Sequence, residues 1–174
     1  MKSVCTLVAL LLPAMLCASV GDLRLIQAVD KGDAKAVRAL LDQHASLIAA
    51  DSDGSTALHH AVKNDNLEIA DLLIVSGASV KAATRYNITP LALACTNGNA
   101  AMIDRLLKAG ADPNGTSEEG QTALMTAALA GKVDAIKLLL ARGAKVNVQE
   151  PVKGQSALMW AVRAMRKSNE PKRD

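Results

Sequence analysis

The sequence predicts an all-α solenoid of stacked helix-turn-helix units joined by β-hairpin-like loops. One eight-residue stretch, GQTALMTA at 120–127, recurs in altered form at 54–61, 87–94 and 154–161. Its hydroxyl residue is Thr56, Thr89, Thr122 or Ser156, which gives steps of 33, 33 and 34 residues. A fixed period of this size indicates a repeat architecture. Half of the residues are hydrophobic but only 1% are aromatic, which suits closely stacked Leu- and Ala-rich helices.

The first helix of each unit begins at the hydroxyl residue. Ser or Thr before an apolar run is typical of a helix N-cap, because its oxygen accepts a free backbone N–H of the first turn. Pro90 directly follows Thr89, and proline suits the first helical position. Leucine and alanine then recur three residues apart on one face, at Leu58 and Ala61 in the first clear copy.

A stop signal precedes the second helix of each unit, and another follows it. Asp65, Gly98 or Gly131 comes nine residues after the hydroxyl, and glycine ends a helix by adopting the left-handed conformation. A Leu-rich segment follows, and it ends at Gly-Ala pairs that begin at Gly77, Gly110 and Gly143. Each unit is therefore predicted to be helix, turn, helix and extended loop.

These motifs resemble the ankyrin repeat, which has G-x-T-P-L-H-x-A, a glycine, a Leu-rich second helix and G-A-D-x-N. The segments GADPN at 110–114 and GAKVN at 143–147 match that ending closely. The resemblance covers roughly residues 22–165. Only His59 keeps the motif histidine, which in the family braces the turns by hydrogen bonds; Ala92, Met125 and Met159 replace it.

The period divides the chain into a repeat domain at 21–165 and two flanking segments. The predicted units are about 22–52, 53–85, 86–118, 119–152 and a partial fifth unit at 153–165, with its helix at about 156–166. The first unit lacks the motif but keeps its phase, as expected of an end repeat that exposes one face to water. Residues 166–174 form a charged tail.

Residues 1–20 have the layout of a secretory signal peptide. Lys2 precedes an uncharged apolar run from Val4 to Leu16, and the small residues Ala18 and Ser19 follow. We expect cleavage near residues 18–20 and export to the periplasm or the medium. Two alternatives stay open: a membrane anchor formed by residues 3–20, and lipid attachment at Cys17, although Leu16 is not the small residue that a lipoprotein signal needs.

The charge distribution argues against a nucleic-acid partner. The net charge is +3, but five basic and two acidic residues from Arg163 onward contribute +3, and Lys2 adds +1. The rest of the chain therefore carries 3 − 3 − 1 = −1. A nucleic-acid binder is expected to have a basic stripe on its body.

No motif for catalysis, a cofactor or a metal emerges from the sequence. His59 and His60 are adjacent on a helix, so their side chains point about 100° apart and do not form a ligand pair. Cys95 lies in a helix and reads as a small buried hydrophobe. The sequons at Asn87 and Asn114 matter only if the source glycosylates exported proteins, and Asn114 would be the better acceptor.

We therefore expect an exported scaffold that binds another protein, without a cofactor. The alternative is an enzyme or metal-binding protein whose site forms no linear motif. The resemblance implies binding through the loop tips and the concave side of the first helices. The corresponding tip residues are Asp51, Asp53, Arg85, Tyr86, Glu118, Glu119, Glu150 and Lys153. The helix positions are Lys63, Asn64, Thr96, Asn97, Leu129, Ala130 and Arg163.

Among these residues, Tyr86 and Arg85 are the expected anchors, because Tyr and Arg are enriched at binding hot spots. Trp160 aligns with Leu93 and is expected to pack against the preceding repeat instead. The competing surface is the convex side, represented by Lys35, Asp71 and Lys137 on the second helices.

Overall fold

A computed structural model describes residues 23–169 of the chain. The predicted signal segment and the end of the charged tail therefore lie outside the described residues. Within residues 23–169 the regular elements are helices, as predicted. They are α1 (Arg24–Asp30), α2 (Ala34–Asp42), α3 (Ala57–Lys63), α4 (Leu67–Val75), α5 (Pro90–Asn97), α6 (Ala100–Lys108), α7 (Ala123–Leu129), α8 (Val133–Ala141) and α9 (Ala157–Asn169).

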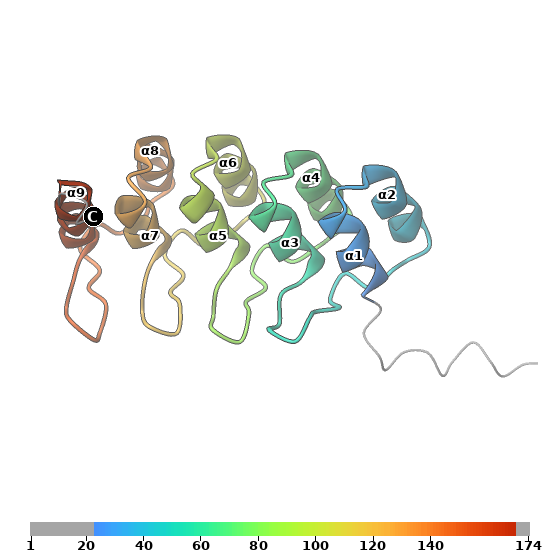
Figure 1. Cartoon of the computed structure of the whole chain (residues 1–174), viewed down its shortest axis with the longest axis horizontal. Helices are drawn as coiled ribbons and strands as arrows, with labels where there is room; N and C mark the ends of the chain where they lie inside the picture. The colour runs from blue at the N-terminus through green and yellow to red at the C-terminus, as the bar shows by residue number, and fades with distance from the viewer. Residues whose placement is uncertain (1–22, 170–174) are drawn as a thin grey trace, which may run out of the picture.

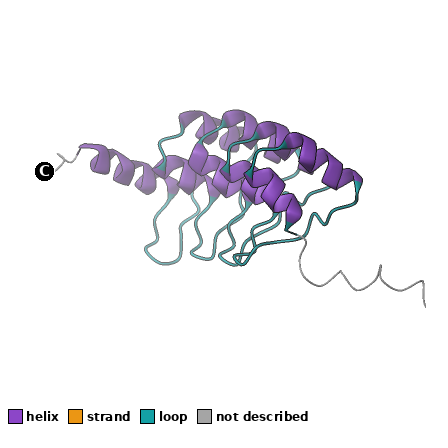
Figure 2. Cartoon of the chain, turned by 45° about the vertical axis from the view of Figure 1, so that its right-hand side comes forward, coloured by secondary structure: helices purple, strands orange, loops and turns teal. Residues whose placement is uncertain are grey.

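The helices form two rows. The first helices of the units, α1, α3, α5, α7 and α9, lie side by side in one row, and α2, α4, α6 and α8 form the second (Figure 1). The loops that connect the units extend together beyond the first row (Figure 2). This arrangement places one loop beside each of the helices α3, α5, α7 and α9, so the loops and the first helices together form one face of the molecule.

One continuous core runs between the rows. Leu58, Leu91 and Leu124, at the repeated leucine position, are only 1–3% exposed. The corresponding Leu158 is 71% exposed, contrary to the pattern, because no second helix covers α9 within the described residues. Trp160 is buried where α9 packs on α7, as predicted.

The predicted stop signals end the helices as expected. Asp65, Gly98 and Gly131 have φ values of 55°, 79° and 65°, all in the left-handed region. At Gly98 a Cβ atom would also overlap the side chain of Lys132, which would have to move. In the first unit His44 takes the left-handed position that glycine holds elsewhere, with φ at 59°.

The helix caps follow the period of the chain. The hydroxyls of Thr89 and Thr122 each accept the backbone N–H three residues later, at 3.3 Å. Side-chain oxygens also cap three of the second helices, at Asp33, Asn66 and Asn99. These three residues recur every 33 positions, so they are a repeated signal for helix starts that our reading of the sequence missed.

The last helix is longer than predicted. α9 continues to Asn169, whereas we expected it to end near residue 166 and the tail to begin there. The physical reason is that Met165 occupies the position of the helix-ending Gly98 and Gly131, so nothing favours a left-handed residue at this point.

Ion pairs connect successive helices of the second row. Arg38 of α2 lies 3.2 Å from Glu68 of α4, Arg105 of α6 lies 2.6 Å from Asp71 of α4, and Arg142 of α8 lies 2.8 Å from Asp104 of α6. The contact between Asp71 and Arg105 has the distance of an ion pair without the alignment of a hydrogen bond. Exposed pairs of this kind contribute little stability. They do occupy Asp71, one of the convex residues that we considered for binding.

None of the helices between residues 23 and 169 combines the length and the apolar character that crossing a bilayer requires.

Candidate functional site

The four loops that project beside α3, α5, α7 and α9 end in tight turns, which we name tip A (residues 51–55), tip B (84–88), tip C (117–121) and tip D (150–155). In tips A to C the first residue donates its backbone N–H to the carbonyl four residues later, as in the 3.0 Å bond from Thr84 to Ile88. In tip D the same bond runs from Glu150 to Gln155, five residues later. Tip D thus contains one extra residue, which accounts for the 34-residue step in the sequence.

The side chain that opens each tip braces the turn from inside. The hydroxyls of Thr84 and Ser117 each accept the backbone N–H four residues later, at 3.2 Å. Asp51 does the same in tip A, where its carboxylate accepts the N–H groups of Asp53 and Ser55 at 2.9 Å. Burial raises the pKa of Asp51, but these bonds and His60 outweigh burial, so the pKa lies below its ordinary value.

Glu150 corrects one of our sequence predictions. We expected it to be presented at the tip, but it is only 5% exposed. Its carboxylate accepts the N–H groups of Val152, Lys153 and Gln155 at 2.7–3.1 Å. Burial raises the pKa of Glu150, but the hydrogen bonds from these N–H groups lower it by more. The pKa therefore lies below its ordinary value. Glu150 therefore braces tip D, and Pro151, Val152 and Lys153 are the exposed residues there.

Backbone hydrogen bonds tie neighbouring tips into a row. The N–H of Arg85 in tip B donates to the carbonyl of Asp53 in tip A at 2.9 Å. One unit later, the N–H of Glu118 donates to the carbonyl of Tyr86 at 3.1 Å. The next residue in this series is Pro151, which has no N–H to donate. The backbone tie therefore connects tips A, B and C and stops before tip D.

The motif histidine supports two tips at once. His59 is buried, and its Nδ1 accepts the N–H of Thr56 at 3.1 Å. Since Nδ1 accepts, Nε2 carries the proton and donates to the carbonyl of Ile88 in tip B, also at 3.1 Å. Burial lowers the pKa of His59 below its ordinary value. The bracing role expected from the ankyrin resemblance is confirmed.

His60 links the first two units. Its Nδ1 lies 2.8 Å from a carboxylate oxygen of Asp30 in α1, and its Nε2 lies 3.1 Å from Asp51. Asn64 adds a hydrogen bond to Asp30 at 3.3 Å. Asp51 and Asn64, both predicted to face a partner, are thus already engaged within the protein.

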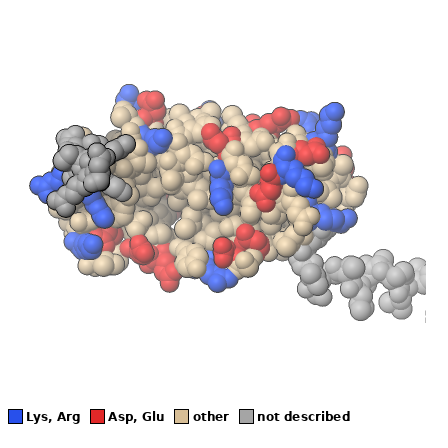
Figure 3. All heavy atoms as spheres, in the orientation of Figure 1, with Lys and Arg blue, Asp and Glu red and all other residues tan. Residues whose placement is uncertain are grey.

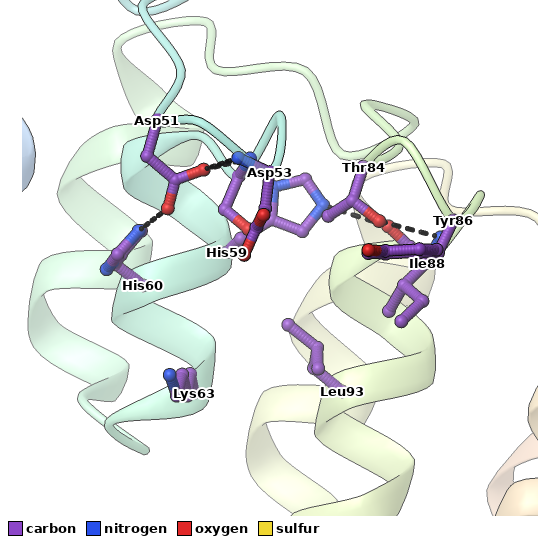
Figure 4. Close-up of a pocket in the computed structure, with 10 residues that line it drawn as sticks. Asp51, Asp53, His59, His60, Lys63, Thr84, Tyr86, Ile88 and Leu93 are labelled. Carbon is purple, nitrogen blue, oxygen red and sulfur yellow. Dashed lines mark hydrogen bonds and ion pairs between the residues drawn. The ribbon is translucent and has the colours of Figure 1, made fainter.

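A groove with a volume of about 210 Å³ is lined by residues of tips A and B and of helices α3 and α5, and we name it the tip groove. Asp53 and Tyr86 form its mouth, Leu93 lies toward its base, and Lys63 lies lower on α3 (Figure 4). The Tyr86 side chain is 52% exposed. The groove therefore offers an aromatic ring and an aliphatic wall beside two opposite charges.

A family model for ankyrin repeats in three copies matches the chain at residues 5–84, 25–117 and 91–169. The chain is an ankyrin-repeat protein. Ankyrin repeats are generally protein–protein interaction modules and are generally not enzymes. No curated protein gives a significant match to the chain.

The structure divides the remaining predicted residues of this ankyrin domain into two groups. The first group makes internal hydrogen bonds: Arg85 to the carbonyl of Ser52, Asn97 to that of Val62, Thr96 to that of Ala92, and Glu119 to Gln121. The second group is exposed, and among the described residues its side chains make no hydrogen bond or ion pair: Asp53, Lys63, Tyr86, Glu118, Lys153 and Arg163. The guanidinium of Arg85 is thus already engaged within the protein, whereas the ring of Tyr86 is exposed.

Acidic side chains outnumber basic ones along the tips. Figure 3 shows Asp and Glu gathered at the lower edge, where the loops of Figure 1 end, with a few Lys and Arg between them. Leu129, the last residue of α7 and therefore at the end of this helix away from tip C, is 41% exposed. Carboxylates thus gather at the tips, and an exposed apolar residue lies farther along α7.

Both sequon asparagines use their amide groups to bind the next unit. Asn87 Nδ2 donates to the carbonyl of Thr116 at 2.5 Å. Asn114 Nδ2 donates to Gly143, while its Oδ1 accepts the N–H of Lys145 at 2.8 Å. Asn114 is therefore not the freer acceptor that its polar loop suggested.

Within residues 23–169, no group of three His, Cys, Asp or Glu side chains is placed to hold a metal ion. Cys95 is buried, and this burial raises the pKa of its thiol to about 12, so it is not poised as a nucleophile.

Proposed function

We propose that this ankyrin domain is an exported scaffold that binds a partner protein through its tips and the adjacent faces of α3, α5, α7 and α9. The observation that carries the proposal is the exposed Tyr86 ring at the mouth of the tip groove. A tyrosine that is half exposed contributes little to the core, while a rigid aromatic ring in a groove can bury a large area at low entropic cost.

The variation between units supports the same surface. Positions that repeat, such as Leu58 and Leu91, are buried and serve the fold. At the equivalent tip position the residues are Asp53, Tyr86 and Glu119, which differ in charge and shape. A constant framework with exposed tips that differ between units is suited to recognising one particular partner surface.

The test begins with capture of a partner from the exported fraction, followed by affinity measurements on variants. Tyr86→Ala is expected to weaken binding by roughly 1–3 kcal/mol and to leave the melting temperature nearly unchanged. Val75→Ala is the matched control, because Val75 is 75% exposed on α4 in the other row of helices. If substitutions at Lys35, Asp71 and Lys137 weaken binding and Tyr86→Ala does not, the convex side is the interface and the proposal is wrong.

We further propose that residues 1–20 direct export and are then removed. The support is the uncharged run after Lys2 and the small residues before Asp22. The intact mass of protein from the exported fraction is expected to correspond to a chain that begins between residues 19 and 21. A chain that still begins at Met1 and is extracted only with detergent would establish the anchor instead.

A further inference from the structure

We infer that the tip groove receives an arginine side chain of the partner, stacked on Tyr86 and paired with the carboxylate of Asp53. This inference rests on the proposed function, because it specifies the partner's chemistry at the same surface. It follows from the charges that the fold leaves unused around an exposed aromatic ring.

The acidic side chains of tip A have unequal roles. The carboxylate of Asp51 is occupied by two backbone N–H groups and by His60. Asp53 takes part in the turn only through its backbone: its N–H donates to Asp51, and its carbonyl accepts from Arg85. Among the described residues its carboxylate has no partner, and Figure 4 shows it directed into the mouth of the groove.

A second carboxylate without a partner among the described residues belongs to Glu118 in tip C, on the other side of tip B. The bond from the Glu118 N–H to the Tyr86 carbonyl places Glu118 next to Tyr86 along the row of tips. The nearest cation of the tips, Arg85, directs its guanidinium to the carbonyl of Ser52. Tip B, which carries Tyr86, thus lies between two tips that each carry a carboxylate without a partner among the described residues, and these two charges favour binding of a cation near the ring.

Arginine fits these features better than a small cation does. Its planar guanidinium can stack on a tyrosine ring and bind a carboxylate through two N–H groups. Its three methylene groups can cover an aliphatic wall, which here is formed by Ile88 and Leu93. Lys63, at the other end of the groove, opposes a cation there and sets the direction of the guanidinium toward Asp53.

The probe for this inference is N-acetyl-arginine N-methylamide, with the citrulline compound as its neutral counterpart of nearly the same shape. Each is titrated into isotopically labelled protein while the NMR signals of Tyr86 and Leu93 are followed. The arginine compound is expected to give saturable shifts at both residues and to bind about 3- to 10-fold more tightly than the citrulline compound, as expected for an exposed cation–π contact and ion pair.

Three variants sharpen the test. Asp53→Asn keeps the backbone bonds of tip A and is expected to weaken binding of the arginine compound by about 3- to 10-fold. Asp42→Asn, a matched loss of an exposed carboxylate on α2, is expected to have no effect. Lys63→Met removes the opposing charge and is expected to tighten binding by about twofold.

The inference is overturned if the arginine compound gives no saturable shift, if the citrulline compound binds equally well, or if Asp53→Asn binds like wild type. The captured partner separates this failure from failure of the proposed function. If Tyr86→Ala weakens binding of the partner and Asp53→Asn does not, only the arginine inference is lost. If neither variant weakens the partner, the tip surface is not the interface and both are lost.

Discussion

Substitution of His59 by alanine should destabilise the domain by about 2–4 kcal/mol. The ring makes two hydrogen bonds, to the Thr56 N–H and the Ile88 carbonyl, and each is worth about 0.5–1.5 kcal/mol. Since the ring is buried, its loss also leaves a cavity between α3 and tip B. Urea denaturation followed by circular dichroism measures the difference.

The chain itself suggests an intermediate variant. In the third motif copy Met125 replaces the histidine, and its sulfur lies 3.5 Å from the N–H of Thr122. His59→Met should therefore fill the space and keep a weak contact at Thr56 while losing the bond to Ile88. We expect its cost to be about half that of His59→Ala, or roughly 1–2 kcal/mol.

The pH dependence provides an independent readout. Burial lowers the pKa of His59 in the folded state below the unfolded value of about 6.5. Between these two values the unfolded chain binds the proton more readily, so stability falls as the pH drops through about 6.5. His59→Ala should lose this part of the acid sensitivity. His44→Asn, which removes an exposed imidazole at a left-handed position that asparagine tolerates, should keep it.

A cost below about 0.5 kcal/mol for His59→Ala, together with an unchanged acid limb, would refute the bracing role. That result would mean that water replaces the hydrogen bonds of His59 to Thr56 and Ile88 without loss of stability. The family histidine would then be dispensable in this unit as well, as it is in the unit that carries Ala92.

Three further predictions test the core, the thiol and tip D. Leu106→Ala in α6 should cost about 2–5 kcal/mol in urea denaturation, since Leu106 is fully buried, and a cost below half a kcal/mol would place it outside the core. Cys95 should remain unreactive toward an aromatic disulfide reagent until the domain unfolds, because its thiol is buried with a pKa raised to about 12; prompt labelling would contradict this. Glu150→Gln should lower the melting temperature at pH 7, whereas Glu118→Gln should not, and because the pKa of Glu150 is lowered, the difference should shrink as the pH falls below about 4.5.

The period in the sequence was sufficient to predict the helices and, apart from the end of α9, the signals that end them. Thr89 and Gly98 mark the two ends of α5 through local chemistry, a cap and a left-handed residue, so they act in the same way in each copy. Asn66 and Asn99 carry an equally local signal, which could have been read from their spacing. Helix ends that are marked by a repeated local signal were therefore predictable.

The direction of a side chain within a turn was not predictable in the same way. Glu150 occupies the same position as Thr84 and Ser117, and its length and charge suggest exposure. In the structure one extra residue in tip D brings three N–H groups within reach of its carboxylate. Whether a charged side chain at a tip points outward depends on the number of donors that the turn directs inward, and a repeat pattern does not report that number.

The backbone ties between tips bear on how a partner could use the face. Arg85 and Glu118 each donate to the preceding tip, so tips A, B and C form one connected row with Tyr86 at its centre. Ordering such loops upon binding would cost free energy, and a row that is already connected lowers that cost. Pro151 ends the series and leaves tip D outside it. A partner centred on Tyr86 and extending over tips A to C would therefore meet three tips whose backbones are tied to one another, whereas tip D is braced by Glu150 but has no such tie to tip C. This difference places the energetic centre of the proposed interface in the units that carry α3 and α5.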